Sequence, residues 1–193
     1  MTNFATFRNH KPLGKLLYTL AAPRAKLFTG KVTPYLNPKD KILDIGAGIC
    51  DIDKLLMDAD FQITPLDIKN LSLNDISPIL YDGKRMPFQD KSFDVALLLT
   101  VLHHTADPEH VLREARRVAQ KIIIIEDIFS TPHHRRLTLF MDSLLNFEFV
   151  GHPHSNKTDA EWRALFKDED MHLSATDGFH SFVVMKHQLY CVE

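Results

Sequence analysis

The chain has 193 residues, of which 45% are hydrophobic, and a formal net charge of −2 at pH 7. This length suits one well-buried domain and is short for two, so we expect a single domain. A sequence pI near 6.6 gives no overall positive field, which argues against nucleic acid as a partner. Two cysteines, Cys50 and Cys191, do not form a disulfide framework and fit a reducing cytoplasm.

A helical pattern of apolar residues runs from Leu13 to Phe28 near the start of the chain. We expect Pro23 to break this helix, and Pro34 and Pro38 to close the segment. The apolar stretch 16–22 superficially resembles a secretory leader, but it is short for one, and a proline and basic residues follow it at once. No segment approaches the ~20 apolar residues that span a bilayer. We therefore expect a cytoplasmic protein without an integral membrane segment.

Residues 41–50 combine a short apolar run, an acidic residue and two glycines: Asp44, Gly46 and Gly48. The apolar run is typical of a buried parallel strand, and the glycines allow a sharp turn and a close approach to a ligand. A dinucleotide fingerprint would need a third glycine where the chain has Asp51, which argues against NAD. The segment predicts a ligand-binding turn.

Strands and helices then alternate up to about residue 128, the pattern of βαβ units in a parallel sheet with helices on both faces. The expected elements are strands at 61–67, 92–99 and 121–126, and helices at 52–58 and 108–118. Asp107 is placed to cap the second helix, with Pro108 in its first turn.

Residues 133–149 are apolar and aromatic with roughly helical spacing after a basic start. They predict either a helix packed on the sheet or a lid or membrane-surface helix over an apolar substrate, so peripheral membrane contact stays open. Residues 151–156 predict either a loop near the substrate entrance or a plain turn.

The last part of the chain predicts a helix and two strands. Thr158 and Glu161 have the form of a capping box that opens a helix at 160–166. Strands are expected at 171–175 and 179–191, on either side of Asp177-Gly178, a hairpin turn signal.

In order and spacing, these landmarks resemble the class I S-adenosylmethionine-dependent methyltransferases. The matching motifs are Asp44-Ile-Gly-Ala-Gly48, a second strand ending in Asp67, Asp82-Gly83 before Met86-Pro-Phe88, the strand 92–99 with the loop 101–108, and the strand 121–126. The resemblance implies a doubly wound, Rossmann-like, seven-stranded sheet that is mostly parallel, with its last strand antiparallel. Two features depart from the family: Cys50 stands where a third glycine is common, and the glycine-rich turn before the fifth strand is missing.

The resemblance also implies a site for S-adenosylmethionine. Its cofactor-binding residues would be Asp44, Gly46, Ala47, Gly48, Asp67, Ile68, Asp82, Gly83 and Leu99. Asp67 would accept hydrogen bonds from the ribose hydroxyls, Ile68 would cover one adenine face, and Asp82 would meet the adenine amino group. Asp44 would brace the turn or meet the methionine amino group. Read alone, Asp82-Gly83 is equally a simple turn.

His103 and His104 follow the fourth strand, where open parallel sheets place ligands. His104 is the candidate catalytic base, and the alternative is that the pair only orders the loop. Eleven histidines suggest a metal, yet no partner stands at ligand spacing, so we expect no metal site.

The expected function is methyl transfer from S-adenosylmethionine to a small-molecule or lipid-like acceptor. The alternative is a catalytically inactive, methyltransferase-like binding protein. Within one domain, we expect a helical cap at 1–38, a cofactor-binding half at 39–128 and a substrate-side half at 129–193.

Overall fold

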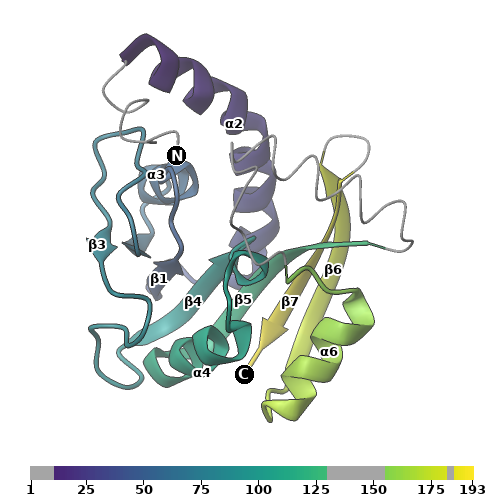
Figure 1. Cartoon of the computed structure of the whole chain (residues 1–193). Helices are drawn as coiled ribbons and strands as arrows, with labels where there is room; N and C mark the ends of the chain where they lie inside the picture. Colours follow the sequence, from purple (N-terminus) through teal and green to yellow (C-terminus); the bar gives the residue numbers. More distant parts are fainter. Residues whose placement is uncertain (1–10, 130–154, 182–184) are drawn as a thin grey trace.

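The computed structural model describes residues 11–129, 155–181 and 185–193. They build a seven-stranded sheet with the strand order β3-β2-β1-β4-β5-β7-β6 (Figure 1). The strands are β1 (Lys41–Ile45), β2 (Gln62–Asp67), β3 (Ile79–Leu80), β4 (Phe93–Leu99), β5 (Ala119–Ile128), β6 (Leu173–Ser181) and β7 (Met185–Val192). Strands β1 to β5 pair in parallel, and β7 is antiparallel to both β5 and β6.

Helices cover both faces of this sheet, as the sequence predicts. The helices are α2 (Lys11–Val32), α3 (Asp51–Asp58), α4 (Pro108–Val118) and α6 (Asp159–Asp168), with short 3-10 turns η1 (Thr33–Tyr35) and η2 (Leu102–His104). The isoleucines of β5 alternate between the two cores: Ile122 and Ile124 face the side of α4 and α6, whereas Ile123 and Ile125 face the side of α2 and α3. The predicted fold class is confirmed.

Helix α2 corrects the expectation of a break at Pro23. The helix runs without interruption from Lys11 to Val32. A proline inside a helix costs about 3 kcal/mol, mainly through a lost hydrogen bond and a steric clash. Just after the proline, Ala25, Phe28 and Val32 are buried against the sheet, and this apolar contact offsets the cost.

The end of the sheet corrects a second expectation. Strand β6 continues straight through Asp177-Gly178, whose residues pair with Leu189 and Gln188 of β7. The two strands stay paired as far as Ser181 and Met185, so the reversal lies beyond the predicted position. The Asp-Gly signal failed because ladder pairing continued on both sides of it.

The predicted helix caps are confirmed. The Asp107 side chain accepts a hydrogen bond from the backbone of His110 at the start of α4. Thr158 and Glu161 form the capping box of α6. The apolar stretch 133–149 and the histidines around residue 152 lie outside the described residues. Among the described residues, no helix is long and apolar enough to cross a membrane, and no group of three acidic, histidine or cysteine side chains is arranged to hold a metal.

Candidate functional site

The two-glycine turn connects β1 to α3 at the carboxyl end of the sheet. Gly46 has φ +80°, and a Cβ there would lie 2.6 Å from a methyl group of Val101, so only glycine fits. The N–H groups of Gly46 and Ala47 donate to the Leu66 carbonyl at 2.8 and 3.2 Å. These bonds fix the turn against the end of β2.

Cys50, which replaces a common glycine, adopts the conformation that a glycine would take easily. Its φ is +57°, and it directly precedes α3 without a side-chain cap. Its side chain is fully buried. Burial and the charge of Asp53 raise the pKa of its thiol to about 12, so the thiol stays neutral. The substitution therefore keeps the turn in shape.

Asp67 at the end of β2 braces the same turn. One oxygen of its carboxylate accepts the Gly48 N–H at 2.9 Å, and the other accepts the Lys69 N–H at 3.0 Å. The residue is 7% exposed. Each carboxylate oxygen has a second lone pair, so Asp67 can still accept two further hydrogen bonds.

Three further acidic side chains gather around the turn. Asp44 of β1 is 4% exposed, Asp51 at the start of α3 is 9% exposed, and Asp53 is fully buried. Burial is the largest cause of a raised pKa at all three. Neighbouring carboxyl groups add to the rise at Asp44, and the charge of Asp51 adds to it at Asp53. Arg24 of α2 acts in the opposite direction on Asp51.

Ile68, which follows Asp67 in the chain, lies side by side with Gly83. A Cβ on Gly83 would come 3.4 Å from a methyl group of Ile68, and Ile68 is 55% exposed. This exposed apolar surface suits one face of an adenine. Asp82 is exposed, and an oxygen of its carboxylate accepts the Lys84 N–H at 2.9 Å, which lowers its pKa. Leu99, at the end of β4, is buried with 8% exposure.

The loop after β4 is held by Glu126, a residue that the sequence analysis treated only as the end of a strand. One oxygen of its carboxylate accepts the N–H groups of Val101 and Leu102 at 3.1 and 2.8 Å. The other lies 2.5 Å from Nδ1 of His103, and both side chains are fully buried. His103 therefore orders the loop, and His104, which is partly exposed, remains the candidate base.

A second acid–histidine pair lies on the opposite face of β5. Asp127 Oδ1 is 2.6 Å from Nδ1 of His187, and Nε2 of His187 contacts the Ser181 hydroxyl. Burial raises the pKa of Asp127, but His187 and the charges of His103 and Arg24 outweigh it, so the net shift is downward. The consecutive acids that end an isoleucine-rich strand were a sequence signal for these pairs.

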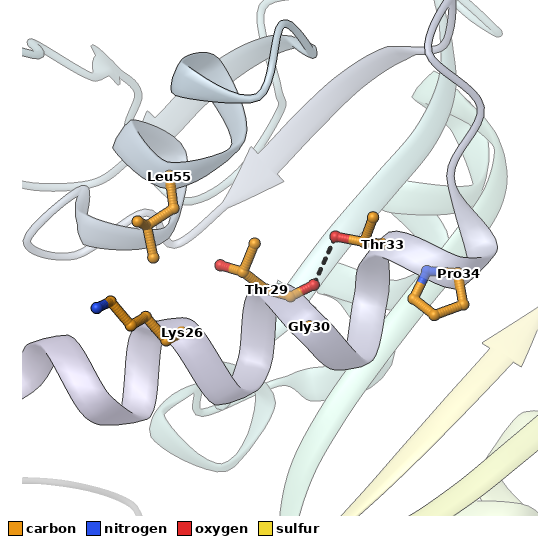
Figure 2. Close-up of a pocket in the computed structure, with 6 residues that line it drawn as sticks. All are labelled: Lys26, Thr29, Gly30, Thr33, Pro34 and Leu55. Atoms are coloured by element: carbon orange, nitrogen blue, oxygen red, sulfur yellow. Dashed lines mark hydrogen bonds between the residues drawn. The ribbon is translucent and has the colours of Figure 1, made fainter.

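Two surface hollows border α2. A pocket of about 560 Å³ lies between the first turns of α2 and the loop after β2, and is lined by Lys15, Tyr18, Asn70 and Asn74 among others. The Asn74 side chain donates to the Cys50 carbonyl at 2.6 Å, which ties this loop to the glycine turn. A groove of about 500 Å³ between α2 and α3 contains none of the predicted site residues (Figure 2).

Known proteins share sequence and fold with this part of the chain. Residues 43–122, from β1 to β5, match the family model described as a methyltransferase domain. Over β1 to β5 the chain is therefore similar to the class I S-adenosylmethionine-dependent methyltransferases, as the sequence motifs predict.

Three similar proteins illustrate the family. The chain is 32% identical over 115 residues to the demethylmenaquinone methyltransferase of Thermotoga maritima, a match covering 53% of this chain and 49% of that protein. It is 31% identical over 97 residues to the 27-O-demethylrifamycin SV methyltransferase of Amycolatopsis mediterranei, covering 43% and 36%. The chain thus spans about half or less of the length of these relatives.

The fold is also that of a solved structure with a bound ligand. Magnesium protoporphyrin IX methyltransferase from Synechocystis PCC 6803, determined with bound S-adenosylhomocysteine, has a TM-score of 0.63 and 15% identity. The match covers 89% of this chain and 82% of that one. At this identity the likeness concerns the fold.

Proposed function

We propose that the protein transfers the methyl group of S-adenosylmethionine to a small-molecule or lipid-like acceptor. The observation that carries this proposal is the group of buried carboxyls around the glycine turn: Asp44, Asp51, Asp53 and Asp67. Buried charges need partners, and here the neighbouring carboxyl groups of Asp53, Asp67 and Asp51 raise the pKa of Asp44 instead. A nucleoside ligand with positive charge on its sulfur and its amino group would supply the positive charge that these carboxyl groups lack.

The same acids disfavour a dinucleotide. A pyrophosphate binds at a helix N-terminus because the free N–H groups and the helix dipole attract negative charge. Here the first turn of α3 carries Asp51 and Asp53, both buried. Two phosphates placed there would meet negative charge at close range.

The residues around the turn fit the parts of the cofactor. Asp67, with two acceptor positions left after its backbone bonds, would take the ribose hydroxyls. Ile68 would cover an adenine face with its exposed side chain, and Asp82 would accept from the adenine amino group. Asp44 would meet the ammonium of the methionine part.

The chemistry needs little from the protein beyond placement. When bound, the cofactor supplies a methyl group on a positively charged sulfur, which leaves as a neutral thioether. This chain holds the acceptor in line and excludes water. His104, on the loop that Glu126 fixes, would remove a proton from the acceptor where one must leave.

The choice of a small acceptor is supported by two relatives, which are named for a menaquinone precursor and for a rifamycin. The match covers 49% of the first protein and 36% of the second, so the acceptor class is part of the proposal.

Calorimetry with S-adenosylmethionine and S-adenosylhomocysteine tests the proposal first. We expect both to bind in the micromolar range. If neither binds, the proposal is rejected. The second step is incubation with methyl-labelled cofactor and a cell extract separated into protein, nucleic acid, lipid and polar metabolites. Label in the lipid or metabolite fraction supports the proposal. Label in protein or nucleic acid overturns the choice of acceptor, and cofactor binding without any transfer favours a binding protein.

A further inference from the structure

Asp44 and Asp53 form a buried pair of carboxyl groups directly behind the glycine turn. Asp44 lies in β1 and keeps 4% exposure, whereas Asp53 lies in the first turn of α3 and has none. Neither oxygen of Asp53 makes a hydrogen bond of normal geometry with an N–H or O–H group of the described residues. The side chains that act on Asp53 at short range are the Asp44 carboxyl and the Cys50 thiol. Two carboxyl groups can share a hydrogen bond only if one of them holds a proton.

Other groups facing the pair do not neutralise it. Asp51 on α3 and Asp67 on β2 add negative charge. Burial raises the pKa of Asp53 to about 7 and that of Asp44 well above its ordinary value. The Cys50 thiol next to Asp53 stays neutral.

The basic side chain that acts on this group of acids is Arg24. It acts on Asp51, where its charge lowers the pKa, and it donates a hydrogen bond to the Thr100 hydroxyl at 2.6 Å. It is not among the groups that act most strongly on the pair of Asp44 and Asp53. The pair therefore has its charge reduced by a proton and not by a neighbouring cation.

We propose that Asp44 and Asp53 share one proton in the ligand-free protein and release it when a ligand bearing an ammonium group binds beside the glycine turn. This inference rests on the proposed function, because the ligand meant is the amino-acid part of S-adenosylmethionine or S-adenosylhomocysteine. Asp44, the more exposed of the two, contacts the ammonium, and Asp53 sets how readily Asp44 ionises.

The exchange is balanced in charge. Before binding, the pair holds one proton and carries one negative charge. The ammonium brings one positive charge, the shared proton passes to solvent, and the pair then carries two negative charges beside the ligand. Because the proton must leave, affinity should fall as the pH drops below about 7, by up to about tenfold for each pH unit.

Calorimetry on the whole chain measures the proton directly. S-adenosylhomocysteine is titrated at pH 6.5 in two buffers that differ strongly in ionisation enthalpy. The difference in heat should correspond to the release of between half and one proton for each ligand bound, the approximate range for a group titrating near 7. 5′-Methylthioadenosine, which lacks the amino-acid part, should bind without proton release. Equal heats for S-adenosylhomocysteine in both buffers would overturn the inference.

Substitution locates the proton. In Asp53→Asn the Asp53 carboxyl no longer raises the pKa of Asp44, so proton release should fall clearly below that of the parent and affinity should vary less between pH 6 and pH 8. Asp58→Asn is the matched control, because Asp58 is an exposed acid of the same helix that pairs with Lys54. It should release the proton as the parent does. Release in Asp53→Asn equal to that of the parent overturns the assignment to this pair.

The failure of the inference differs from the failure of the proposed function. Binding of S-adenosylhomocysteine without proton release overturns the inference alone. No binding at any pH from 6 to 8 overturns both. If Asp53→Asn does not fold, the comparison of buffers on the parent chain still decides the question.

Discussion

Buried acidic side chains stand on both sides of the site, and their neighbours differ. On the side of β1 and α3, Asp44 and Asp53 face each other, and burial raises the pKa of both. On the side of β5, Glu126 accepts two backbone N–H groups and lies 2.5 Å from His103. The residue after Glu126 is paired with a histidine in the same way.

The acids of β5 have hydrogen-bond donors within the protein, whereas Asp44 and Asp53 face each other. Where the protein provides its own donors, an acid stabilises the fold and fixes a loop. Where acids face acids, folding gains nothing from their charge, and a cationic ligand is the partner that would make the arrangement favourable. The same type of residue therefore serves the scaffold on one side and the ligand on the other. Substitutions on the two sides should have opposite consequences.

The largest effect is expected at Glu126. Glu126→Ala leaves two buried N–H groups and His103 without their acceptor, so the free energy of unfolding should fall by about 3–5 kcal/mol. Urea denaturation measures this loss. Glu126→Gln keeps one oxygen and serves as the milder control, with a smaller loss. A destabilisation below about 1 kcal/mol in Glu126→Ala would mean that this side of the site is not held by its acid.

Substituting His104 and His103 in turn tests which of the two histidines takes part in the reaction. With an acceptor from the extract experiment, His104→Ala should lower turnover roughly a hundredfold while affinity for the cofactor stays nearly intact. The acid limb of the pH profile should be lost as well. His103→Ala is the neighbouring control and should mainly lower stability, because it leaves the Glu126 carboxylate buried without its histidine. Equal pH profiles for His104→Ala and the parent would rule out a base at this position.

On the ligand side, Asp67→Ala should weaken the binding of S-adenosylhomocysteine at least tenfold, since charge-assisted hydrogen bonds are worth about 1.5–3 kcal/mol each. The structure adds a second reason, because the same carboxylate holds the Gly48 N–H at 2.9 Å. Asp67→Asn keeps one acceptor oxygen and should lose less. Calorimetry gives the affinities, and circular dichroism checks that the fold survives. An unchanged affinity would show that Asp67 does not bind the ligand.

Most of the fold could be predicted because its signals are local. The apolar run before Gly46, the cap at Asp107 and the capping box of Thr158 each depend on a few neighbouring residues, and the structure has all three. Pro23 and Asp177-Gly178 misled because tertiary contacts outweighed a local preference: a buried helix face in one case and a continuing ladder in the other.

The site was less accessible from the sequence because its key contacts join distant residues. Asp44 could be placed beside the turn from its own motif, but its contact with Asp53 depends on how α3 packs against β1. The partner of His103 is 23 positions further on, in another strand. Adjacent histidines look equivalent in a sequence, and only the strand pairing shows that one of them is fully buried.

The smallest expected effect is the change in folding stability with pH that Asp53 causes. Burial raises the pKa of Asp53 in the folded protein to about 7, above the value of about 3.9 expected in the unfolded chain. The folded protein thus binds the shared proton more tightly, and its stability from this group is greatest below the unfolded pKa. As pH rises from about 4 to 7, stability should be lost, by at most about 1.4 kcal/mol for each pH unit.

Asp53→Asn removes the titrating group and with it this loss. The variant should therefore gain more stability relative to the parent at pH 8 than at pH 5, with a difference of about 1 kcal/mol or more. Thermal unfolding at both pH values measures the difference, and Asp58→Asn, an exposed acid on the same helix, should change little at either. If Asp53→Asn is less stable than the parent by the same amount at both pH values, Asp53 is an ordinary structural acid like Glu126. The contrast between the two sides of the site would then disappear, because both sets of acids would be complete without a ligand.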